Sequence, residues 1–340
     1  MRNSAVAPGA VGDLSEAELI ARVQAHLPPR PGWMLVGIGD DAAVVEPERN
    51  RLEVLTVDAL VEGVHFDRAF TPARAIGHRA LAVNLSDIAA MGAAPRLALL
   101  SFALPPHLPL ADFDDILAGL TALALRHRVH VAGGNLTRSP GPLMLDVMLA
   151  GTVKRRRPLL RSGARAGDDL YVSGTIGAAT AGLAMLSERP ELAAEDGSPS
   201  VGRYLYPDPR IRLGLLIGRT RAASACMDLS DGLADAVRQV AAASGVGAAI
   251  DAEALPIEAE ARAWFTAHGD DAVRAAVEGG DDYELLVAAH PRHRRRLEAA
   301  RRLSGVSLTR IGVCTKDRAV TIGQSDGSTR PMPRGYAHFR

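Results

Sequence analysis

The sequence has few cysteines and no long apolar run. Only two cysteines, Cys226 and Cys314, occur among its 340 residues, which excludes a disulfide framework and a zinc motif built on cysteine pairs. Charged residues such as Asp87 interrupt the longest apolar stretch, so no run reaches the roughly 18 residues of a membrane-spanning helix. Residues 1–12 are polar and carry no signal-peptide core. We therefore expect a cytoplasmic protein without a membrane partner.

The sequence also has no excess of either charge. Lys plus Arg and Asp plus Glu both number 39, so no global field attracts nucleic acid or a membrane surface. A local basic run at residues 292–296 falls in a helical pattern and is typical of a solvated helix face. We expect no nucleic-acid partner.

The common nucleotide-binding motifs are missing as well. No Gly-x4-Gly-Lys-Ser/Thr loop occurs, and neither residues 37–39 nor residues 245–247 complete a dinucleotide fingerprint. If the protein binds ATP, it must hold the phosphates by another arrangement, with metal ions and backbone amides.

What the sequence does contain is a series of aspartates at the ends of apolar runs, beside small residues. A carboxylate in such a place suits Mg²⁺, which is held by one or two carboxylates together with water and phosphates. Several such carboxylates predict several ions and a substrate rich in phosphate. The series comprises Asp40, Asp41, Asp58, Asp87, Asp228, Asp231, Asp281 and Asp282.

Simpler interpretations exist for parts of this series. An aspartate beside glycine is commonly a turn residue, and Ser230 or Asp231 could be a helix cap. The pair Gly133-Gly134 permits either a tight turn or a close backbone approach to a ligand. His65 and Tyr336 fit a substrate contact or an ordinary half-buried position. From the residues alone, we expect a metal-dependent enzyme that acts on phosphates.

Hydrophobic patterning predicts a mixed α/β or α+β protein of two domains. We expect a flexible arm at residues 1–12, an N-terminal domain at 13–153 and a C-terminal α+β domain at 154–340. In the helix expected between residues 72 and 91, Asn84 and Asp87 lie one turn apart on one side. The other predicted helices are 15–27, 111–127, 178–186, 210–219 and 232–243. The predicted strands are 35–38, 52–57, 97–104, 129–132, 143–153, 170–173, 223–227, 246–250, 283–288, 308–313 and 320–322.

As a set, the motifs resemble those of the thiamine-monophosphate kinase family, in the family's order and over nearly the whole chain. The strongest are residues 84–93 (NLSDIAAMGA), 227–233 (MDLSDGL) and 280–285 (GDDYEL). Residues 37–43 (GIGDDAA), 63–66 (GVHF), 161–163 (RSG) and 335–339 (GYAHF) also fit.

The resemblance implies a fold and an activity. The family shares a superfamily with aminoimidazole ribonucleotide synthetase, selenophosphate synthetase and a hydrogenase-maturation protein. Its N-terminal domain contributes to a dimeric barrel, so a homodimer is expected. The implied reaction transfers the γ-phosphoryl group of ATP to thiamine monophosphate, the last step of thiamine diphosphate biosynthesis. Because the acceptor phosphate is already anionic, no catalytic base is expected, and positioning and charge neutralisation dominate.

The resemblance also implies roles for residues. The implied ligands of several Mg²⁺ ions are Asp41, Thr56, Asp58, Asp87, Asn135, Asp228 and Asp231. The implied ATP contacts are Gly134, Asn135, Arg161 and Ser230. The implied contacts to thiamine monophosphate are His65, Asp281 and Tyr336.

Three departures from the family pattern qualify this assignment. Val57 replaces a hydroxyl residue and Asn135 replaces an aspartate, both at what looks like the same ion position, and Asp281 stands where glutamate is usual. We expect an active enzyme that needs more Mg²⁺ than a typical member. The alternatives are a weakened paralogue that only binds nucleotide or thiamine phosphate, and a related ATP-dependent enzyme with another small acceptor.

Overall fold

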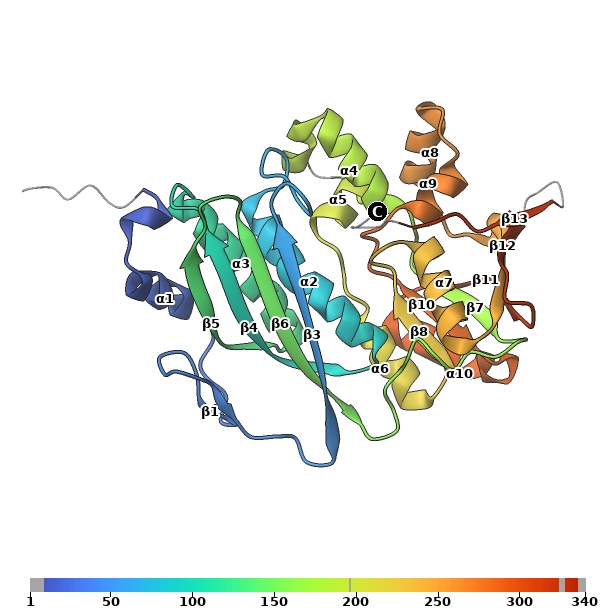
Figure 1. The fold of residues 1–340 in the computed structure, drawn as a ribbon, viewed down its shortest axis with the longest axis horizontal. Helices are drawn as coiled ribbons and strands as arrows, with labels where there is room; N and C mark the ends of the chain where they lie inside the picture. Colours follow the sequence, from blue (N-terminus) through green and yellow to red (C-terminus); the bar gives the residue numbers. More distant parts are fainter. Residues whose placement is uncertain (1–8, 196, 324–327, 336–340) are drawn as a thin grey trace, which may run out of the picture. The chain divides into compact units, whose positions relative to one another are not determined.

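The computed structural model describes residues 9–195, 197–323 and 328–335 of this mixed α/β protein (Figure 1). The chain forms two compact units. The first comprises residues 1–49, 55–84 and 95–151, and the second comprises residues 50–54, 85–94 and 152–340. The predicted N-terminal arm lies outside the described residues up to residue 8. In the described part of the arm, Val11 is buried and donates its backbone N–H to Leu108 O at 2.8 Å.

The first unit is built on a four-stranded sheet in the order β3-β6-β4-β5. Its strands β4 and β5 run parallel, with Ser101 opposite Asn135. The elements are η1 (Val11–Asp13), α1 (Glu16–Ala25), β1 (Met34–Val36), β2 (Val44–Val45), β3 (Arg51–Val61), α2 (Ala73–Ala90), β4 (Ala94–Leu104), α3 (Leu110–His127), β5 (His130–Arg138) and β6 (Met144–Lys154). The ends of α2, β3, β4 and β6 fall in the second unit.

Helices α2 and α3 cover one face of this sheet (Figure 1). They approach closely because glycines lie at the crossing. A Cβ atom on Gly77 would come within 1.8 Å of Ile116 O, and one on Gly119 within 1.9 Å of Arg74 O. Apolar side chains between the helices and the sheet, such as Leu81 and Phe113, are fully buried. In the described part of the first unit, α2 and α3 lie on this face alone, and the opposite face has no long helix over it (Figure 1).

The second unit is built on a seven-stranded sheet in the order β13-β12-β9-β11-β7-β10-β8. Helix α7 packs on it over a core that includes Leu170, Met227, Val237 and Leu286. The elements are β7 (Asp169–Ser173), α4 (Ala178–Glu188), η2 (Pro190–Ala194), α5 (Pro199–Leu205), α6 (Ile211–Thr220), β8 (Ala225–Asp228), α7 (Leu233–Ser244), β9 (Gly247–Asp251), η3 (Ala252–Ala254), α8 (Ala259–Ala267), α9 (Ala272–Glu278), β10 (Leu285–Ala289), η4 (Pro291–His293), α10 (Arg294–Ser304), β11 (Leu308–Thr315), β12 (Val320–Gly323) and β13 (Thr329–Pro331).

A buried ion cluster holds the start of β10 in this unit. Glu284 is fully buried and accepts from Arg203 Nη1 at 2.7 Å, from Arg210 Nε at 2.7 Å and from Ser173 Oγ at 2.5 Å. Two guanidinium groups and a hydroxyl thus satisfy the carboxylate, as a buried charge requires. The cluster ties β10 to β7 and to the segments around α5 and α6.

The long periodic helices and the short strands β7, β8, β9 and β12 were predicted correctly, but several short helices were not. The helix expected at residues 72–91 is confirmed as α2, but no pattern indicated the short helices α5, α8 and α9. The strand expected to end at Ala132 continues to Arg138 as β5. The strand expected from Tyr283 begins at Leu285, because the preceding residues form a turn with left-handed φ angles at Asp281 and Tyr283.

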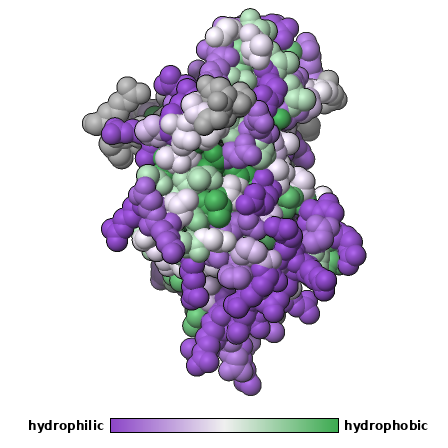
Figure 2. Space-filling view, turned by 90° about the vertical axis from the view of Figure 1, so that its right-hand side faces the viewer, coloured by the Kyte–Doolittle hydropathy of each residue, from purple (hydrophilic) through white to green (hydrophobic). Residues whose placement is uncertain are grey.

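The basic run at residues 292–296 lies on η4 and α10, and Figure 2 shows mostly hydrophilic residues over the lower part of the face that it displays. Several of the arginines have local partners. Arg294 pairs with Asp169 at 3.2 Å, and Arg296 donates to Thr220 O at 3.3 Å. Within the described ranges, no helix is both long and apolar enough to cross a membrane.

Candidate functional site

The uncovered face of the first sheet carries a hollow with a volume of about 1030 Å³. It lies between that face, the segment at residues 37–43 and one side of α1. Six residues discussed in the sequence analysis line it together: Asp40, Asp41, Val57, Gly133, Gly134 and Asn135. The first unit therefore brings the two unusual positions, Val57 and Asn135, to one place beside a carboxylate.

Alternation along β3 separates Val57 from its neighbours. Val57 is 60% exposed and lines the hollow, whereas Thr56 and Asp58 are half-buried and do not line it. Successive side chains of a strand point to opposite faces. Thr56 and Asp58 therefore lie on the other face of the sheet, and the residues assigned to metal ions do not form one group within this unit.

The glycine pair lies within β5, where it allows two strands to approach closely, and it does not form a turn. A Cβ atom on Gly134 would come within 1.9 Å of Leu100 O on β4, at a φ of +155°. Only glycine fits such a contact without moving the backbone. The approach places Asn135, which is exposed, opposite Ser101 on the hollow face.

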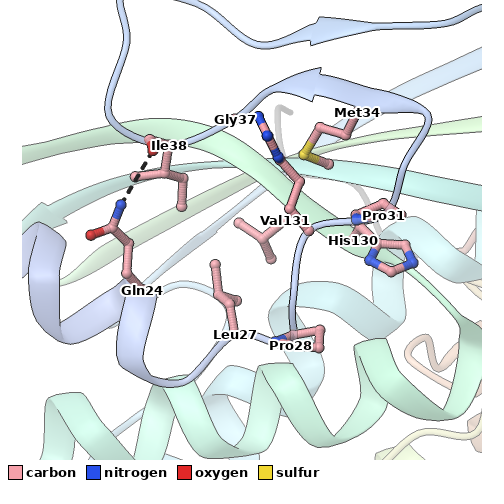
Figure 3. Close-up of a pocket in the computed structure, with 10 residues that line it drawn as sticks. Gln24, Leu27, Pro28, Pro31, Met34, Gly37, Ile38, His130 and Val131 are labelled. Atoms are coloured by element: carbon pink, nitrogen blue, oxygen red, sulfur yellow. Dashed lines mark hydrogen bonds between the residues drawn. The ribbon is translucent and has the colours of Figure 1, made fainter.

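A hydrogen bond joins the segment that carries Asp41 to helix α1. Gln24 Nε2 donates to Ile38 O at 3.2 Å, beside a smaller cavity of about 310 Å³ lined by Leu27, Val131 and His130 (Figure 3). Partial burial lowers the pKa of His130, which favours its neutral form. On the exposed side, Asp41 N donates to Asp40 Oδ1 at 2.9 Å, so Asp40 braces the turn.

His65 lies in the turn that follows β3. Its Nδ1 accepts from Val61 N at 3.1 Å, and its backbone carbonyl accepts from Arg79 Nη2 at 3.5 Å. Because Nδ1 is an acceptor in this geometry, a neutral ring carries its proton on Nε2. The imidazole is half-buried.

In the second unit, Asp228 ends β8 and is only 2% exposed. Its Oδ2 accepts from Ser86 Oγ at 2.7 Å. Ser86 lies in the last turns of α2, directly before Asp87. A buried carboxylate needs such donors or a cation to offset its lost hydration. Asp228 therefore has an environment that suits a metal ligand.

Two motif turns of the second unit are hydrogen-bonded to each other. Asp281 N donates to Ser230 O at 2.8 Å, and Tyr283 N donates to Leu229 O at 3.1 Å. A Cβ atom on Gly280 would come within 2.4 Å of Ser230 O. The turns at residues 228–232 and 279–284 therefore form one structure, which brings Asp228, Ser230 and Asp281 together.

Neither Ser230 nor Asp231 is the helix cap that the simpler interpretation suggested. The N-cap of α7 is Gly232, with a φ of +91°. Arg161 reaches the same helix, since its Nη1 donates to Gln239 Oε1 at 2.6 Å. Tyr336 lies outside the described residues, but Gly335 lies against Asp231 at the start of α7.

The oxygen donors in both units suit a hard cation. Carboxylates, hydroxyls and an amide are the ligand types that Mg²⁺ accepts, and it needs only one or two of them when phosphates complete its shell. No group of three or more His, Cys, Asp or Glu side chains placed to hold a metal ion occurs at residues 9–195, 197–323 and 328–335. The donor set thus fits Mg²⁺ bound together with a nucleotide.

The cysteines have no place in this chemistry. Both are buried and free, and burial raises the pKa of each thiol to about 12. They remain protonated and unreactive near neutral pH.

Sequence reasoning missed two residues at these places. Ser86 belongs to the motif at residues 84–93, and a serine in the middle of an apolar helix is a signal of a buried polar partner. Asp146 on β6 lines the hollow, and a single carboxylate inside a predicted apolar strand could have drawn attention to it.

Comparison with known proteins agrees with this architecture. Residues 39–153 match the N-terminal domain, and residues 165–324 the C-terminal domain, of AIR synthase related proteins. The class of protein is therefore a two-domain AIR synthase related α/β protein.

The relatives narrow this class. A thiamine-monophosphate kinase of Salmonella typhimurium is 40% identical over 310 residues, which are 89% of this chain and 91% of the relative. The crystal structure of thiamine-monophosphate kinase from Stenotrophomonas maltophilia K279a has a TM-score of 0.80 and 39% identity, and the match covers 93% of this chain and 98% of that one. A structure of AaThiL complexed with AMPPCP and TMP has a TM-score of 0.74 and 31% identity, over 98% of this chain and 100% of that one. The chain belongs to the thiamine-monophosphate kinase family, which confirms the resemblance.

Asp282 gives the second unit a testable pH dependence. It is 1% exposed and accepts from Gly177 N at 2.7 Å and Ala179 N at 3.2 Å, at the start of α4. Burial raises the pKa of Asp282 to about 7, the two amides partly opposing the shift. The folded protein therefore holds a proton that the unfolded chain releases above about pH 4.

We predict that Asp282→Asn flattens the pH dependence of stability. The free energy of unfolding of the wild type minus that of the variant should fall as pH rises from about 4 to about 7, by at most about 1.4 kcal/mol per pH unit. Urea unfolding at several pH values measures this difference. The lost hydrogen bonds add only a constant offset, so a difference that does not change with pH would contradict the raised pKa.

Proposed function

We propose that this protein transfers the γ-phosphoryl group of ATP to thiamine monophosphate, giving thiamine diphosphate and ADP. The observation that carries the proposal is membership of the thiamine-monophosphate kinase family over nearly the whole chain, with both motif turns of the second unit intact. The AMPPCP and TMP in the related AaThiL structure support ATP and thiamine monophosphate as the ligands.

The reaction asks the protein mainly to hold two anions in line. A phosphate oxygen of thiamine monophosphate attacks the γ-phosphorus of ATP, a new P–O bond forms, and the bond to ADP breaks. Since the acceptor oxygen is already ionised, positioning and charge neutralisation set the rate, with no side chain as catalytic base. The exposed Arg161 guanidinium, anchored by Gln239, suits phosphate oxygens of ATP.

The residues of each unit supply different parts of this proposal. We assign Asp41, Thr56, Asp58 and Asn135 of the first unit and Asp87, Asp228 and Asp231 of the second as ligands of several Mg²⁺ ions. Bound Mg²⁺ would screen the charge of the phosphates that must approach each other. Gly134 and Ser230 join Asn135 and Arg161 as ATP contacts, and His65, Asp281 and Tyr336 would contact thiamine monophosphate.

We propose a cytoplasmic location, because two buried, unpaired thiols are typical of proteins that never meet oxidising conditions.

The first test is incubation of the purified protein with ATP, Mg²⁺ and thiamine monophosphate, with thiamine diphosphate and ADP measured by chromatography. We expect the two products in equal amounts. Asp87→Asn should lower turnover by orders of magnitude and leave the circular dichroism spectrum and melting temperature close to those of the wild type. Near wild-type turnover in this variant would remove Asp87 from the reaction.

A wild-type protein that makes no thiamine diphosphate over a wide Mg²⁺ range, yet melts at a higher temperature with both ligands, would be a binding paralogue. Val57 and Asn135, which lie in the same hollow, are the observations that favour this second candidate. ADP formed only with another acceptor would indicate the related-enzyme alternative.

A charge change at Asn135 tests the expected demand for Mg²⁺. Asn135→Asp adds a carboxylate to the hollow that contains Asp41, and we expect the half-saturating Mg²⁺ concentration to fall by roughly tenfold, because ligand charge tunes divalent-cation affinity. Calorimetric titration with Mn²⁺ in the presence of an ATP analogue measures binding separately from turnover. The exposed Asn50→Asp is the matched control, and equal half-saturation in all three proteins would refute the expectation.

We also propose that the first sheet pairs with that of a second copy as a dimeric barrel. Its uncovered face exposes the apolar side chains of Leu55 at 65%, Val57 at 60% and Met144 at 37%, and exposed apolar side chains gathered on one face are typical of interfaces. Light scattering should give twice the mass of the 35.8 kDa chain. Leu55→Arg should yield monomers, unlike Leu303→Arg at an exposed position on α10. A monomeric wild type would overturn the proposal.

A further inference from the structure

The turn at residues 279–284 is held in an unusual backbone conformation. Asp281 has a φ of +67° and Tyr283 a φ of +50°. Aspartate tolerates the left-handed region, but a bulky residue such as tyrosine rarely adopts it, and the conformation costs free energy. Such a turn persists only where surrounding contacts determine it.

Alternate residues of the turn provide those contacts. The buried carboxylate of Asp282 accepts two backbone N–H groups at the start of α4, and the buried carboxylate of Glu284 is held by Arg203, Arg210 and Ser173. Both side chains point into the second unit. These contacts fix the backbone of the turn and thereby orient the alternate residues, Asp281 and Tyr283.

The conformation brings the Tyr283 hydroxyl to the side chain of Asp281. The tyrosine is 6% exposed, and its Oη donates to Asp281 Oδ1 at 2.9 Å. Residues two apart on an extended chain point to the same side. The turn holds Asp281 and Tyr283 so that the hydroxyl meets the carboxylate within hydrogen-bond distance.

We propose that Tyr283 is a positioning residue that aims the Asp281 carboxylate at a cationic nitrogen heterocycle in the acceptor substrate. This inference rests on the proposed function, in which Asp281 contacts thiamine monophosphate. A fixed carboxylate suits the positive thiazolium ring and can accept from an amino group on a pyrimidine.

The effect should fall on one substrate. Removing the hydroxyl leaves the Asp281 carboxylate without this donor but does not touch groups assigned to ATP. We expect Tyr283→Phe to raise the KM and the calorimetric Kd for thiamine monophosphate by about tenfold, as for loss of one hydrogen bond to a charged group. The KM for ATP should stay unchanged.

Tyr171→Phe is the matched control. Tyr171 is 8% exposed in the same unit, and its Oη also donates to an aspartate two residues away, Asp169 Oδ2, at 3.3 Å. This variant measures the general cost of removing a buried tyrosine hydroxyl. We expect it to leave both KM values unchanged.

A double-mutant cycle with Asp281→Asn tests whether Tyr283 acts through Asp281. We expect Asp281→Asn to raise the KM for thiamine monophosphate at least as much as Tyr283→Phe, and the double variant to show no further rise. Three results would overturn the inference: an unchanged KM in Tyr283→Phe, equal rises for both substrates, or additive effects in the double variant.

Failure of the inference and failure of the proposed function give different results. A wild type that makes thiamine diphosphate while Tyr283→Phe behaves like Tyr171→Phe refutes only the inference. A wild type that makes none refutes the proposed function. In that case, calorimetry with thiamine monophosphate alone still shows whether the Tyr283 hydroxyl contributes to binding, and equal Kd values for both proteins would refute the inference too.

Discussion

The second unit depends on two buried carboxylates that are separated by one residue, Asp282 and Glu284. Burying them costs hydration, and the protein offsets this cost with the amides at the start of α4 and with the guanidinium groups of Arg203 and Arg210. Because the partners of both carboxylates come from other elements, these contacts fix the position of the turn that carries Asp282 and Glu284. The strained φ angles at Asp281 and Tyr283 follow from that constraint.

This constraint separates two kinds of acidic residue that look alike in the sequence. Asp228 and Asp281 lie at the meeting of the two motif turns, one buried beside Ser86 and one half-buried beside Tyr283. Asp282 and Glu284, in the same motif, face inward and hold the fold. The inward carboxylates fix the backbone of the turn that carries Asp281, which suits chemistry governed by positioning.

The sequence allowed the architecture to be predicted where a pattern was long, as for α2, and failed where tertiary contacts decide. Helices α8 and α9 are too short for their periodicity to stand out, and β5 continues through Gly133-Gly134 because the close contact with Leu100 O on β4 requires a residue without a side chain. Motifs indicated Asp228 and Asp281, but not that Thr56 and Val57 face opposite sides of a sheet. Strand alternation contains that information once the strand is placed.

The charge on the lining of the hollow in the first unit determines how it would bind a cation. Asp41 and Asp146 place carboxylates on its lining, Asn135 offers a neutral amide oxygen, and Val57 offers no oxygen. A divalent cation needs few protein ligands when phosphates supply the others. The oxygen donors of the hollow, Asp41, Asp146 and Asn135, are therefore enough to complete the shell of a cation that arrives with its nucleotide, which is the form of binding that the proposed reaction needs.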